Sequence, residues 1–431
     1  MATWTNWAGT ASADVQVEMP ASVAAVQQAV TTANGACSRI KPIGAGHSFT
    51  AIGVTDGVQL RPEGLTGIVS TDRSTGLVTA LAGTRLHDLN AALWDQGLSM
   101  TNLGDIDVQT IAGAISTGTH GTGAKLGGIA TQVRGVQLVT ADGQLREVDA
   151  ASDPDLFGAV CVGLGALGVI TAVTLQCEPA FALHAQEAPT PLDEVLGDLD
   201  ALVDGHDHFE FYWFPHTRRT LTKRNNRRPV EDGLKPLSRM RHYIDDELLS
   251  NTAFDAINKF TTRRPNVIPR ANRLASRLLS AREYTDRSYE VFASPRRVKF
   301  REMEYAVPRE AVPHVLGELE AYLSRSGEQI GFPVEVRFAA ADDLWLSTAH
   351  GRASGYIAVH QYIRRDHEPY FAAVEAIARS VDGRPHWGKL HNRDAESLRA
   401  AYPRFDDFVA LRDKLDPNRI FSNPYLDRVL G

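Results

Sequence analysis

A glycine-rich loop that carries a histidine is the first stretch of the sequence with residue types suited to binding a charged ligand. Residues 42–50 read PIGAGHSFT and follow a short apolar approach, so we expect a strand that runs into a tight turn. Gly44 and Gly46 can let backbone N–H groups point inward together, which makes an anion-binding concavity. His47 would then present an imidazole to the molecule that carries the anion. Taken alone, a surface turn with a solvated histidine explains the loop equally well.

The two familiar phosphate-binding motifs do not fit this chain. A Rossmann fingerprint requires a third glycine where the loop has Phe49. A Walker loop requires a lysine directly after its last glycine, whereas Gly123 is followed by Ala124 and only then by Lys125. The glycine loop must therefore be interpreted together with the rest of the chain.

A second segment is even richer in glycine and small hydroxyl residues. Residues 102–106 (NLGDI) lead into residues 110–123 (TIAGAISTGTHGTG). Glycine removes side-chain bulk where a flat ring must lie against the backbone, and serine and threonine hydroxyls donate hydrogen bonds to phosphate or ring oxygens. Two such segments, each with a histidine, indicate the two walls of one extended cofactor groove.

Together with residues 334–337 (VEVR) and 384–389 (RPHWGK), these motifs make the chain resemble a known family over nearly its whole length. The family is that of the FAD-dependent sugar-lactone and alditol oxidases of the vanillyl-alcohol-oxidase flavoprotein superfamily, with the strongest resemblance to actinobacterial-type gulono- or arabinono-1,4-lactone oxidoreductases. It implies an α+β, two-domain PCMH-type FAD-binding fold with an antiparallel-sheet-plus-helices substrate (cap) domain. The expected boundaries are residues 1–178 for the FAD-binding domain, 179–384 for the cap domain and 385–431 for a C-terminal return to the FAD-binding domain.

The resemblance also implies FAD as the cofactor, held covalently by an 8α-histidyl link to His47. In the family, the stretch that matches residues 164–171 lies beside the adenine half of FAD. The residues expected to bind the cofactor are His47, Gly44, Ala45, Gly46, Ser48, Phe49, Gly104, Asp105, Thr110, Gly113, Ser116, Thr117, Gly118, Thr119, His120, Val169, Ile170 and His386. No metal is expected.

Two strands of the expected cap domain carry the candidate substrate chemistry. Alternation in residues 334–338 puts Glu335 and Arg337 on one face, and alternation in residues 356–363 puts His360 on a polar face. From alternation alone, an outward-facing strand with an exposed ion pair is the better interpretation. The resemblance reverses it, because Glu335 and Arg337 match the family's substrate-side acid and arginine, and His360 matches a histidine near the reacting carbon.

Lys389 follows a Trp-Gly pair and matches the lysine that the family brings to the flavin edge. Oxidation of an alcohol by a flavin sends a hydride to flavin N5, leaves the hydroxyl proton for a base and places negative charge near N1 and O2. Lys389 is the candidate for charge stabilisation or hydroxyl activation, and His360 is an alternative proton acceptor. Glu335 and Arg337 would orient the sugar, although Glu335 could take part in proton transfer instead. The sequence does not decide between these roles.

Gly104 bears on the electron acceptor, because related enzymes with glycine at this position leave room for O2. It favours an oxidase that releases hydrogen peroxide, while a dehydrogenase that uses a cytochrome or dye stays open.

Asp105 and Tyr362 stand where alditol oxidases carry serine and threonine, which favours an aldono-1,4-lactone over an alditol such as xylitol or sorbitol as the substrate. Two further alternatives are a reductase on the same scaffold that takes electrons from NADPH and a non-catalytic nucleotide- or sugar-binding protein.

The composition agrees with this interpretation without proving it. The length of 431 residues suits a protein of two or three domains. An apolar fraction of 43% and a net charge of −7 are ordinary for a globular protein, and the negative charge gives no sign of nucleic-acid binding. Cys37, Cys161 and Cys177 are too few and too scattered for a disulfide framework or a zinc site, and the last two are expected to be buried thiols. Neither a secretion signal nor an apolar run long enough to span a bilayer is visible. A reducing cytoplasm is the simplest location, and peripheral membrane association stays open.

The remaining pattern concerns the surface of the cap domain. Basic clusters at residues 218–219, 223–228 and 263–264 are expected to lie in solvated loops, since acidic neighbours offset their charge. Residues 232–285 are polar and arginine-rich, and we expect them to form peripheral helices. An amphipathic helix is predicted over residues 403–415.

Overall fold

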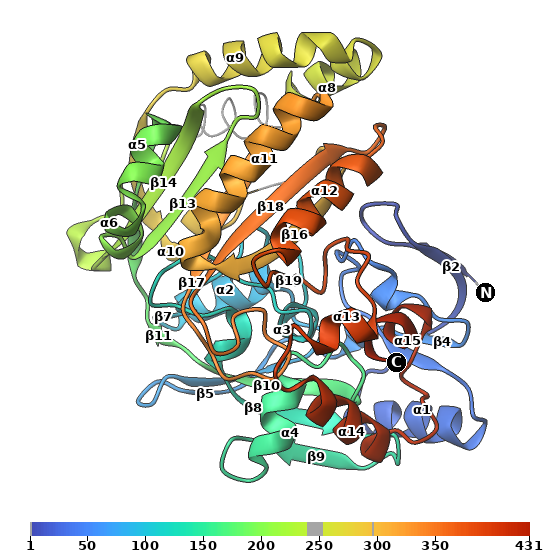
Figure 1. Ribbon diagram of the computed structural model, residues 1–431. Helices are drawn as coiled ribbons and strands as arrows, with labels where there is room; N and C mark the ends of the chain where they lie inside the picture. The colour runs from blue at the N-terminus through green and yellow to red at the C-terminus, as the bar shows by residue number, and fades with distance from the viewer. Residues whose placement is uncertain (1, 239–252, 295–296) are drawn as a thin grey trace.

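The computed structural model describes residues 2–238, 253–294 and 297–431. Two mixed regions of helices and strands lie one above the other in Figure 1, which confirms the predicted α+β class. The lower region contains the N-terminal part of the chain in blue and green and the last helices in red. The upper region is a large antiparallel sheet with helices packed against it, and we call it the cap region.

The lower region contains three sheets. The four-stranded sheet has the order β1-β2-β4-β3, the five-stranded sheet has the order β5-β6-β10-β8-β9, and β7 pairs with β11. Strand β4 pairs in parallel with β2 and β3, whereas the other named pairs are antiparallel. These strands are β1 (Ala2–Thr5), β2 (Ser12–Glu18), β3 (Ile40–Pro42), β4 (Val58–Leu60), β5 (Ile68–Asp72), β6 (Leu77–Leu81), β7 (Leu98–Ser99), β8 (Val133–Val139), β9 (Leu145–Val148), β10 (Val169–Gln176) and β11 (Glu178–Pro179).

The cap region is organised around an eight-stranded sheet of order β15-β12-β14-β13-β17-β18-β16-β19. Its strands are β12 (Ala182–Pro191), β13 (His208–Trp213), β14 (Arg219–Arg228), β15 (Arg282–Arg287), β16 (Phe300–Pro308), β17 (Val334–Ala339), β18 (Ser354–Tyr362) and β19 (Arg384–Pro385). Its helices are α5 (Leu192–Gly197), α6 (Leu199–Asp204), α8 (Phe254–Arg263), α9 (Ile268–Leu278), α10 (Ser288–Phe292), α11 (Val312–Ser326) and α12 (Glu368–Arg379).

The helices of the lower region come from both ends of the chain. They are α1 (Val23–Gly35), α2 (Leu86–Asp95), α3 (Ile111–Ser116), α4 (Pro154–Val160), α13 (Ala395–Arg399), α14 (Phe405–Leu415) and α15 (Pro424–Leu430). The predicted helix over residues 403–415 is confirmed as α14, and Phe405 and Phe408 on it are buried. Trp387 and Phe408 share one hydrophobic core with Leu89 of α2 and Ile115 of α3, so the last part of the chain packs back onto the lower region.

Side-chain alternation gives the cap sheet two different faces. Met303 of β16, Val336 of β17 and Ile357 of β18 belong to an apolar core with α11 and α12, which lie in front of the sheet in Figure 1. The residues between them, such as Glu302 and Glu335, are polar and yet buried, because this face turns toward the lower region. The interpretation from alternation alone, an outward-facing strand with an exposed ion pair, is therefore wrong, and the buried polar face agrees with the interpretation from the resemblance.

The basic stretch at residues 223–228 was expected to be a solvated loop, and this expectation is wrong. It lies within strand β14, which pairs over its length with β12 and β13. Two of its four cations form ion pairs, since Lys223 Nζ lies 3.2 Å from Glu210 Oε1 and Arg227 Nη1 lies 2.7 Å from Glu178 Oε2. The peripheral helices expected within residues 232–285 are present as α8 and α9. The part of that stretch from 239 to 252 lies outside the described residues.

A short seam joins the second glycine segment to the cap sheet. The Phe338 N–H donates to Thr122 Oγ1 at 3.1 Å, and the Gly123 N–H donates to the Phe338 carbonyl at 2.8 Å. The Thr122 hydroxyl donates to the Phe209 carbonyl, and His208 Nδ1 lies 2.8 Å from the Thr122 carbonyl. The seam therefore holds a wall of the groove against two neighbouring strands of the cap.

Two further expectations can be compared with the structure. Cys161 and Cys177 are buried free thiols, as predicted. Burial raises the pKa of each to about 12, so both stay protonated at neutral pH.

None of the helices that the structure describes combines the length and the apolar character needed to cross a membrane.

The buried His208 should make stability depend on pH. Burial lowers its pKa to about 4, below the unfolded value near 6.5, so the unfolded chain takes up a proton in this window that the folded chain does not. Stability should therefore fall as pH decreases from 6.5 toward 4, by roughly 2 kcal/mol from this residue between pH 7.5 and 5. In urea titrations, His208→Gln should show a smaller pH effect than the wild type. The exposed His314 supplies the control, and an equal pH effect in His208→Gln and His314→Gln would contradict the prediction.

Candidate active site

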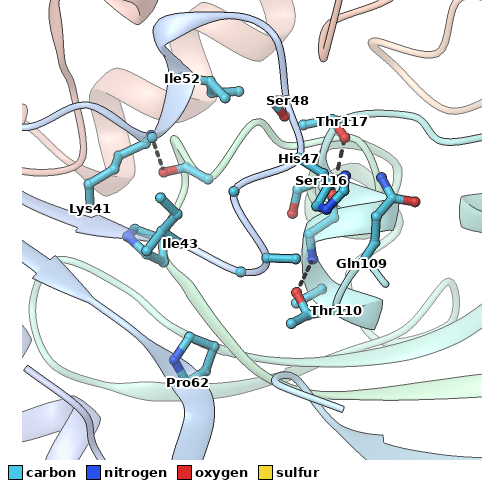
Figure 2. A pocket seen from close by; sticks show the side chains of 18 of the residues that line it. Lys41, Ile43, His47, Ser48, Ile52, Pro62, Gln109, Thr110, Ser116 and Thr117 are labelled. Carbon is cyan, nitrogen blue, oxygen red and sulfur yellow. Dashed lines mark hydrogen bonds between the residues drawn. The ribbon is translucent and has the colours of Figure 1, made fainter. Parts of the chain in front are cut away.

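A cavity of about 930 Å³ lies between the two glycine-rich segments. The loop after β3 forms one wall, α3 and the residues on either side of it form the other, and the start of β10 contributes to one end. Figure 2 shows Lys41 and Pro62 at one side and His47, Ser116 and Thr117 at the other. The two segments thus face a single groove.

The loop approaches α3 so closely that only glycine fits at one position. A Cβ atom on Gly44 would lie 2.2 Å from Thr110 Oγ1. Thr110 is the N-cap of α3, and its hydroxyl accepts a hydrogen bond from the Gly113 N–H at 3.2 Å. Gly46 has a φ of +69°, in the left-handed region that favours glycine. Both glycines leave the backbone of the loop uncovered toward the groove.

The first cavity has no acidic side chain among the described residues that line it. Its lining contains no aspartate or glutamate and includes a lysine, Lys41. Lys41 Nζ donates to the carbonyl groups of Leu164 at 3.3 Å, Gly165 at 3.2 Å and Phe421 at 3.1 Å. Burial lowers the pKa of Lys41 to about 7. Three carbonyl acceptors nevertheless match the three N–H groups of an ammonium ion, which suits the charged form.

A second cavity of about 720 Å³ continues from the first toward the cap sheet. Four residues line both cavities: His47, Ser48, Gln109 and Thr117. The His47 ring stacks on Trp7, with 5.4 Å between the ring centroids. Burial, with the charges of nearby lysines, lowers the pKa of His47 to about 4 and leaves the imidazole neutral at pH 7. His47 therefore stands at the junction between the two cavities as an uncharged ring.

A buried ion pair lies in the second cavity. Lys389 Nζ lies 2.5 Å from Glu302 Oε2, and the other oxygen of Glu302 lies 3.5 Å from His360 Nε2. Burial acts to lower the pKa of Lys389, but the carboxylates of Glu302 and Glu304 outweigh it and the pKa is raised. The pKa of Glu302 is lowered, because Lys389 and His360 outweigh the opposite effect of burial. Lys389 is therefore a protonated cation at neutral pH.

Arg337 forms the centre of a second charged group. Its Nε lies 3.0 Å from Glu210 Oε2, its Nη2 lies 3.4 Å from Asp105 Oδ2, and it also pairs with Glu335. Tyr212 donates its hydroxyl to Glu335 at 2.8 Å. Burial opposes the charge of Arg337, but these carboxylates raise its pKa well above the ordinary value. The guanidinium is thus held in one orientation with an edge on the cavity.

Three buried side chains meet at the wall of the second cavity. The ring and carboxylate atoms of His120, Glu304 and His386 lie within 4.8 Å of one another. His120 Nδ1 lies 2.9 Å from the Gly121 carbonyl and its Nε2 lies 3.1 Å from Glu304 Oε1, so both nitrogens face acceptors. His386 Nδ1 accepts from the Gly388 N–H at 3.0 Å. Internal hydrogen bonds thus use most of the atoms that could bind a metal here.

Comparison with known proteins places this site in a family. The D-arabinono-1,4-lactone oxidase family matches residues 173–429, and an FAD binding domain family matches residues 16–149. The chain belongs to the D-arabinono-1,4-lactone oxidase family. It is an FAD-dependent oxidoreductase of the kind that acts on CH–OH groups.

Relatives of this family member cover essentially the whole chain. L-gulono-1,4-lactone dehydrogenase of Mycobacterium tuberculosis is 42% identical over 99% of each chain. L-gulonolactone oxidase of Bos taurus is 34% identical over 98% of this chain and 97% of its own, and alditol oxidase of a Streptomyces species is 32% identical over 99% and 98%. Cholesterol oxidase from Brevibacterium sterolicum superposes over the full chain with a TM-score of 0.84 at 19% identity, which shows a shared fold.

The first cavity of this family member has the donor set that FAD requires. A dinucleotide presents a negative pyrophosphate, hydroxyl groups and two flat rings. A lining with a lysine, several hydroxyl groups and no carboxylate suits the first two, and the uncovered backbone at Gly44 and Gly46 leaves room for close approach. The residues present therefore fit the cofactor that the family model names.

Most of the candidate residues from the sequence line these cavities. The first cavity is lined by Gly44, Ala45, Gly46, His47, Ser48, Thr110, Gly113, Ser116, Thr117, Val169 and Ile170. The second adds Phe49, Asp105, Thr119, His120, Arg337, His386 and Lys389. Gly104, Gly118, Glu335 and His360 are not among the lining residues. Glu335 and His360 contact the site through Arg337 and Glu302, whereas a Cβ on Gly104 would lie 3.2 Å from the His120 carbonyl.

Sequence reasoning missed several residues of the site. Glu302 and Glu304 were not among the candidates, although their alternation with Met303 and Tyr305 separates polar from apolar positions. Cross-strand register places Glu302 opposite His360, which no local pattern shows. Lys41 precedes the glycine loop directly, and an isolated lysine on a short strand carries no further signal.

Removing the Glu302 charge should move the pH profile of the reaction. In Glu302→Gln, Lys389 loses its nearest carboxylate, so its pKa should fall by about one unit or more. The rate of anaerobic flavin reduction is measured by stopped-flow absorbance as a function of pH. The alkaline limb of this pH–rate profile should shift to lower pH by a similar amount. Glu375→Gln supplies the control, because Glu375 is also buried but is bonded to Tyr305 and Asn392 outside the cavity. An unshifted limb in Glu302→Gln would contradict the assignment of Lys389 as the titrating group.

Proposed function

We propose that this protein oxidises an aldono-1,4-lactone of the L-gulono or D-arabinono type and that O2 is its electron acceptor. The observation that carries the proposal is the continuity of the two cavities at His47, which joins the groove suited to FAD to a chamber with fixed cations. The names of the relatives support the lactone as the substrate class. A lactone offers a carbonyl, a ring oxygen and several hydroxyl groups, which rigid charged side chains can orient.

FAD, when bound, supplies the hydride acceptor of such a reaction. Lys389 would stabilise negative charge that develops at the cofactor edge, because it is already protonated. Arg337 donates hydrogen bonds to the sugar, and Glu335 fixes the orientation of Arg337. The substrate hydroxyl proton passes to His360 through Glu302, which contacts both His360 and Lys389. A protonated lysine cannot itself accept this proton.

Substrate class can be tested with the purified, FAD-loaded enzyme under anaerobic conditions. Gulono- or arabinono-1,4-lactone should bleach the flavin absorbance, whereas xylitol, sorbitol and NADPH should do so at least tenfold more slowly or not at all. Lys389→Ala should slow the bleaching by on the order of a hundredfold or more while FAD stays bound. Faster reduction by an alditol would make the alditol the substrate, and near-normal reduction of Lys389→Ala would remove the proposed role of the lysine.

The proposed acceptor rests on Gly104. A Cβ atom on Gly104 would lie 3.2 Å from the His120 carbonyl oxygen and 3.3 Å from the Thr119 methyl carbon, so a larger residue would push on the wall of the second cavity. Glycine therefore keeps this wall in place beside the cavity. After the lactone has reduced the flavin, readmission of air should restore the spectrum of the oxidised flavin and release a stoichiometric amount of hydrogen peroxide. Slow recovery in air and rapid recovery with a cytochrome or dye would instead identify a dehydrogenase.

The covalent link from His47 to the cofactor is also part of the proposal. A neutral imidazole has a free nitrogen lone pair, and burial keeps His47 neutral above pH 4. Its position between the two cavities supports this link, because a cofactor that extends from one cavity to the other would pass beside the ring. After acid precipitation, yellow fluorescence should remain with the wild-type polypeptide and be released from His47→Ala. His87→Ala, at an exposed histidine on α2, should behave as the wild type. Retained flavin in His47→Ala would show that another residue forms the link.

A further inference from the structure

Helices α8 and α9 are oriented with polar residues inward, which is the reverse of an ordinary surface helix. The buried residues of α8 are Asn258 and Thr261, and those of α9 are Asn272, Ser276 and, at its first position, Ile268. The buried Asn272 side chain is hydrogen-bonded, because its Nδ2 donates to the Pro215 carbonyl at 3.0 Å and the Ile330 carbonyl at 2.9 Å. Hydrogen bonds from Asn272 to the backbone of the cap therefore dock α9, whereas Asn258 and Thr261 of α8 donate to carbonyl groups of their own helix.

The outward side of the two helices carries large apolar side chains instead. Ile257 is 46% exposed, Phe260 is 51%, Leu274 is 60% and Leu278 is 74%. They account for four of the seven exposed large apolar side chains among the described residues. The spacing of Ile257 and Phe260, and of Leu274 and Leu278, places each pair on one side of its helix. Such grouping marks an interaction surface, whereas scattered single residues do not.

The same side of the helices is strongly basic. Residues 253–280 contain six lysines and arginines and one aspartate, a formal charge of +5 in a chain whose net charge is −7. Lys259, Arg263, Arg270, Arg273 and Arg277 are all exposed. Arg270, Arg273 and Arg277 recur at helical spacing beside Leu274 and Leu278, so cations flank the apolar stripe.

We propose that α8 and α9 form a docking surface for the headgroup region of an anionic lipid bilayer. Figure 1 shows both helices across the top of the molecule, at the opposite end from β9 and α14. Their outward side is therefore clear of the region that holds the glycine groove. Helices that lie on a membrane bury apolar side chains a few ångströms below the headgroups and place lysine and arginine among the lipid phosphates. The apolar stripe flanked by cations has this arrangement.

The charge pattern favours a bilayer over other occupants. A second copy of this chain would bring the same excess of positive charge to the interface, which costs energy where like charges approach. A soluble polyanion would use the arginines but would gain nothing from Phe260, Leu274 and Leu278. A bilayer that contains acidic lipids contacts both kinds of side chain at once.

The test uses the full-length, FAD-loaded protein and flotation with lipid vesicles. The wild type should float with vesicles in which about a third of the lipid is phosphatidylglycerol, and only weakly with pure phosphatidylcholine. The double variant Leu274→Ser, Leu278→Ser and the triple variant Arg270→Gln, Arg273→Gln, Arg277→Gln should each lower the partition coefficient roughly tenfold or more. Both should keep the activity of the wild type toward its substrate in solution, which shows that they fold.

Matched controls come from exposed residues elsewhere. Met19 and Val69 are each 62% exposed, so Met19→Ser with Val69→Ser removes comparable apolar surface. The triple variant Arg73→Gln, Arg379→Gln, Lys414→Gln removes the same charge from other exposed positions. Both controls should change the partition coefficient less than twofold.

Three results would overturn the proposal. The first is a wild type that does not float with anionic vesicles. The second is flotation that the leucine variant retains in full, which would identify a purely electrostatic surface. The third is a wild-type dimer, measured by light scattering, that the leucine variant converts to a monomer without any vesicle binding, which would make a second copy the occupant.

Discussion

The ion pair between Lys389 and Glu302 is the interaction on which the active site depends. Glu302 is buried and Lys389 is partly buried, and charges that have lost much of their water are stable only when they are paired and hydrogen-bonded. The cap sheet meets this requirement by placing Glu302 opposite His360 across two strands and by receiving Lys389 from the returning C-terminal segment. A backbone hydrogen bond of 2.7 Å from the Phe49 N–H to the Gly388 carbonyl ties that segment to the glycine loop. Lysine, cofactor groove and cap sheet therefore take their positions together.

The two cavities differ in charge, and the difference follows from which elements line them. The first is built from glycine turns and the N-cap of α3, and no carboxylate of the described lining faces it. The second contains Asp105, Glu302, Glu304, Arg337 and Lys389, in which each cation has an acidic partner. A cavity without carboxylates admits a phosphate-bearing cofactor, whereas a cavity of paired charges offers directed hydrogen bonds to a neutral polyhydroxylated substrate.

The fold does not decide the substrate. Cholesterol oxidase from Brevibacterium sterolicum shares this fold at 19% identity, so the fold alone does not identify the substrate. In this chain, we propose that specificity comes from side chains on the polar face of the cap sheet and from Asp105, which pairs with Arg337. Tyr362, which sequence comparison with alditol oxidases suggested as a determinant, donates instead to Asp255 at 3.0 Å and packs with Phe49, Phe300 and Phe332. Tyr362 lines neither of the two cavities.

The sequence by itself determined the glycine walls, the central histidine, the strand with Glu335 and Arg337 and the family, because each depends on residue types at short spacing. It also predicted helix α14 and the buried thiols, which follow from local periodicity and apolar context. Only the tertiary structure decided which polar strand faces are buried, that residues 223–228 form a strand and that Glu302 holds Lys389. These facts depend on cross-strand register and on contacts between residues far apart in the chain, such as the 87 positions that separate Glu302 from Lys389. Local sequence carries no record of such pairings, since the same alternation of polar and apolar residues suits a solvated strand face and a buried one equally well.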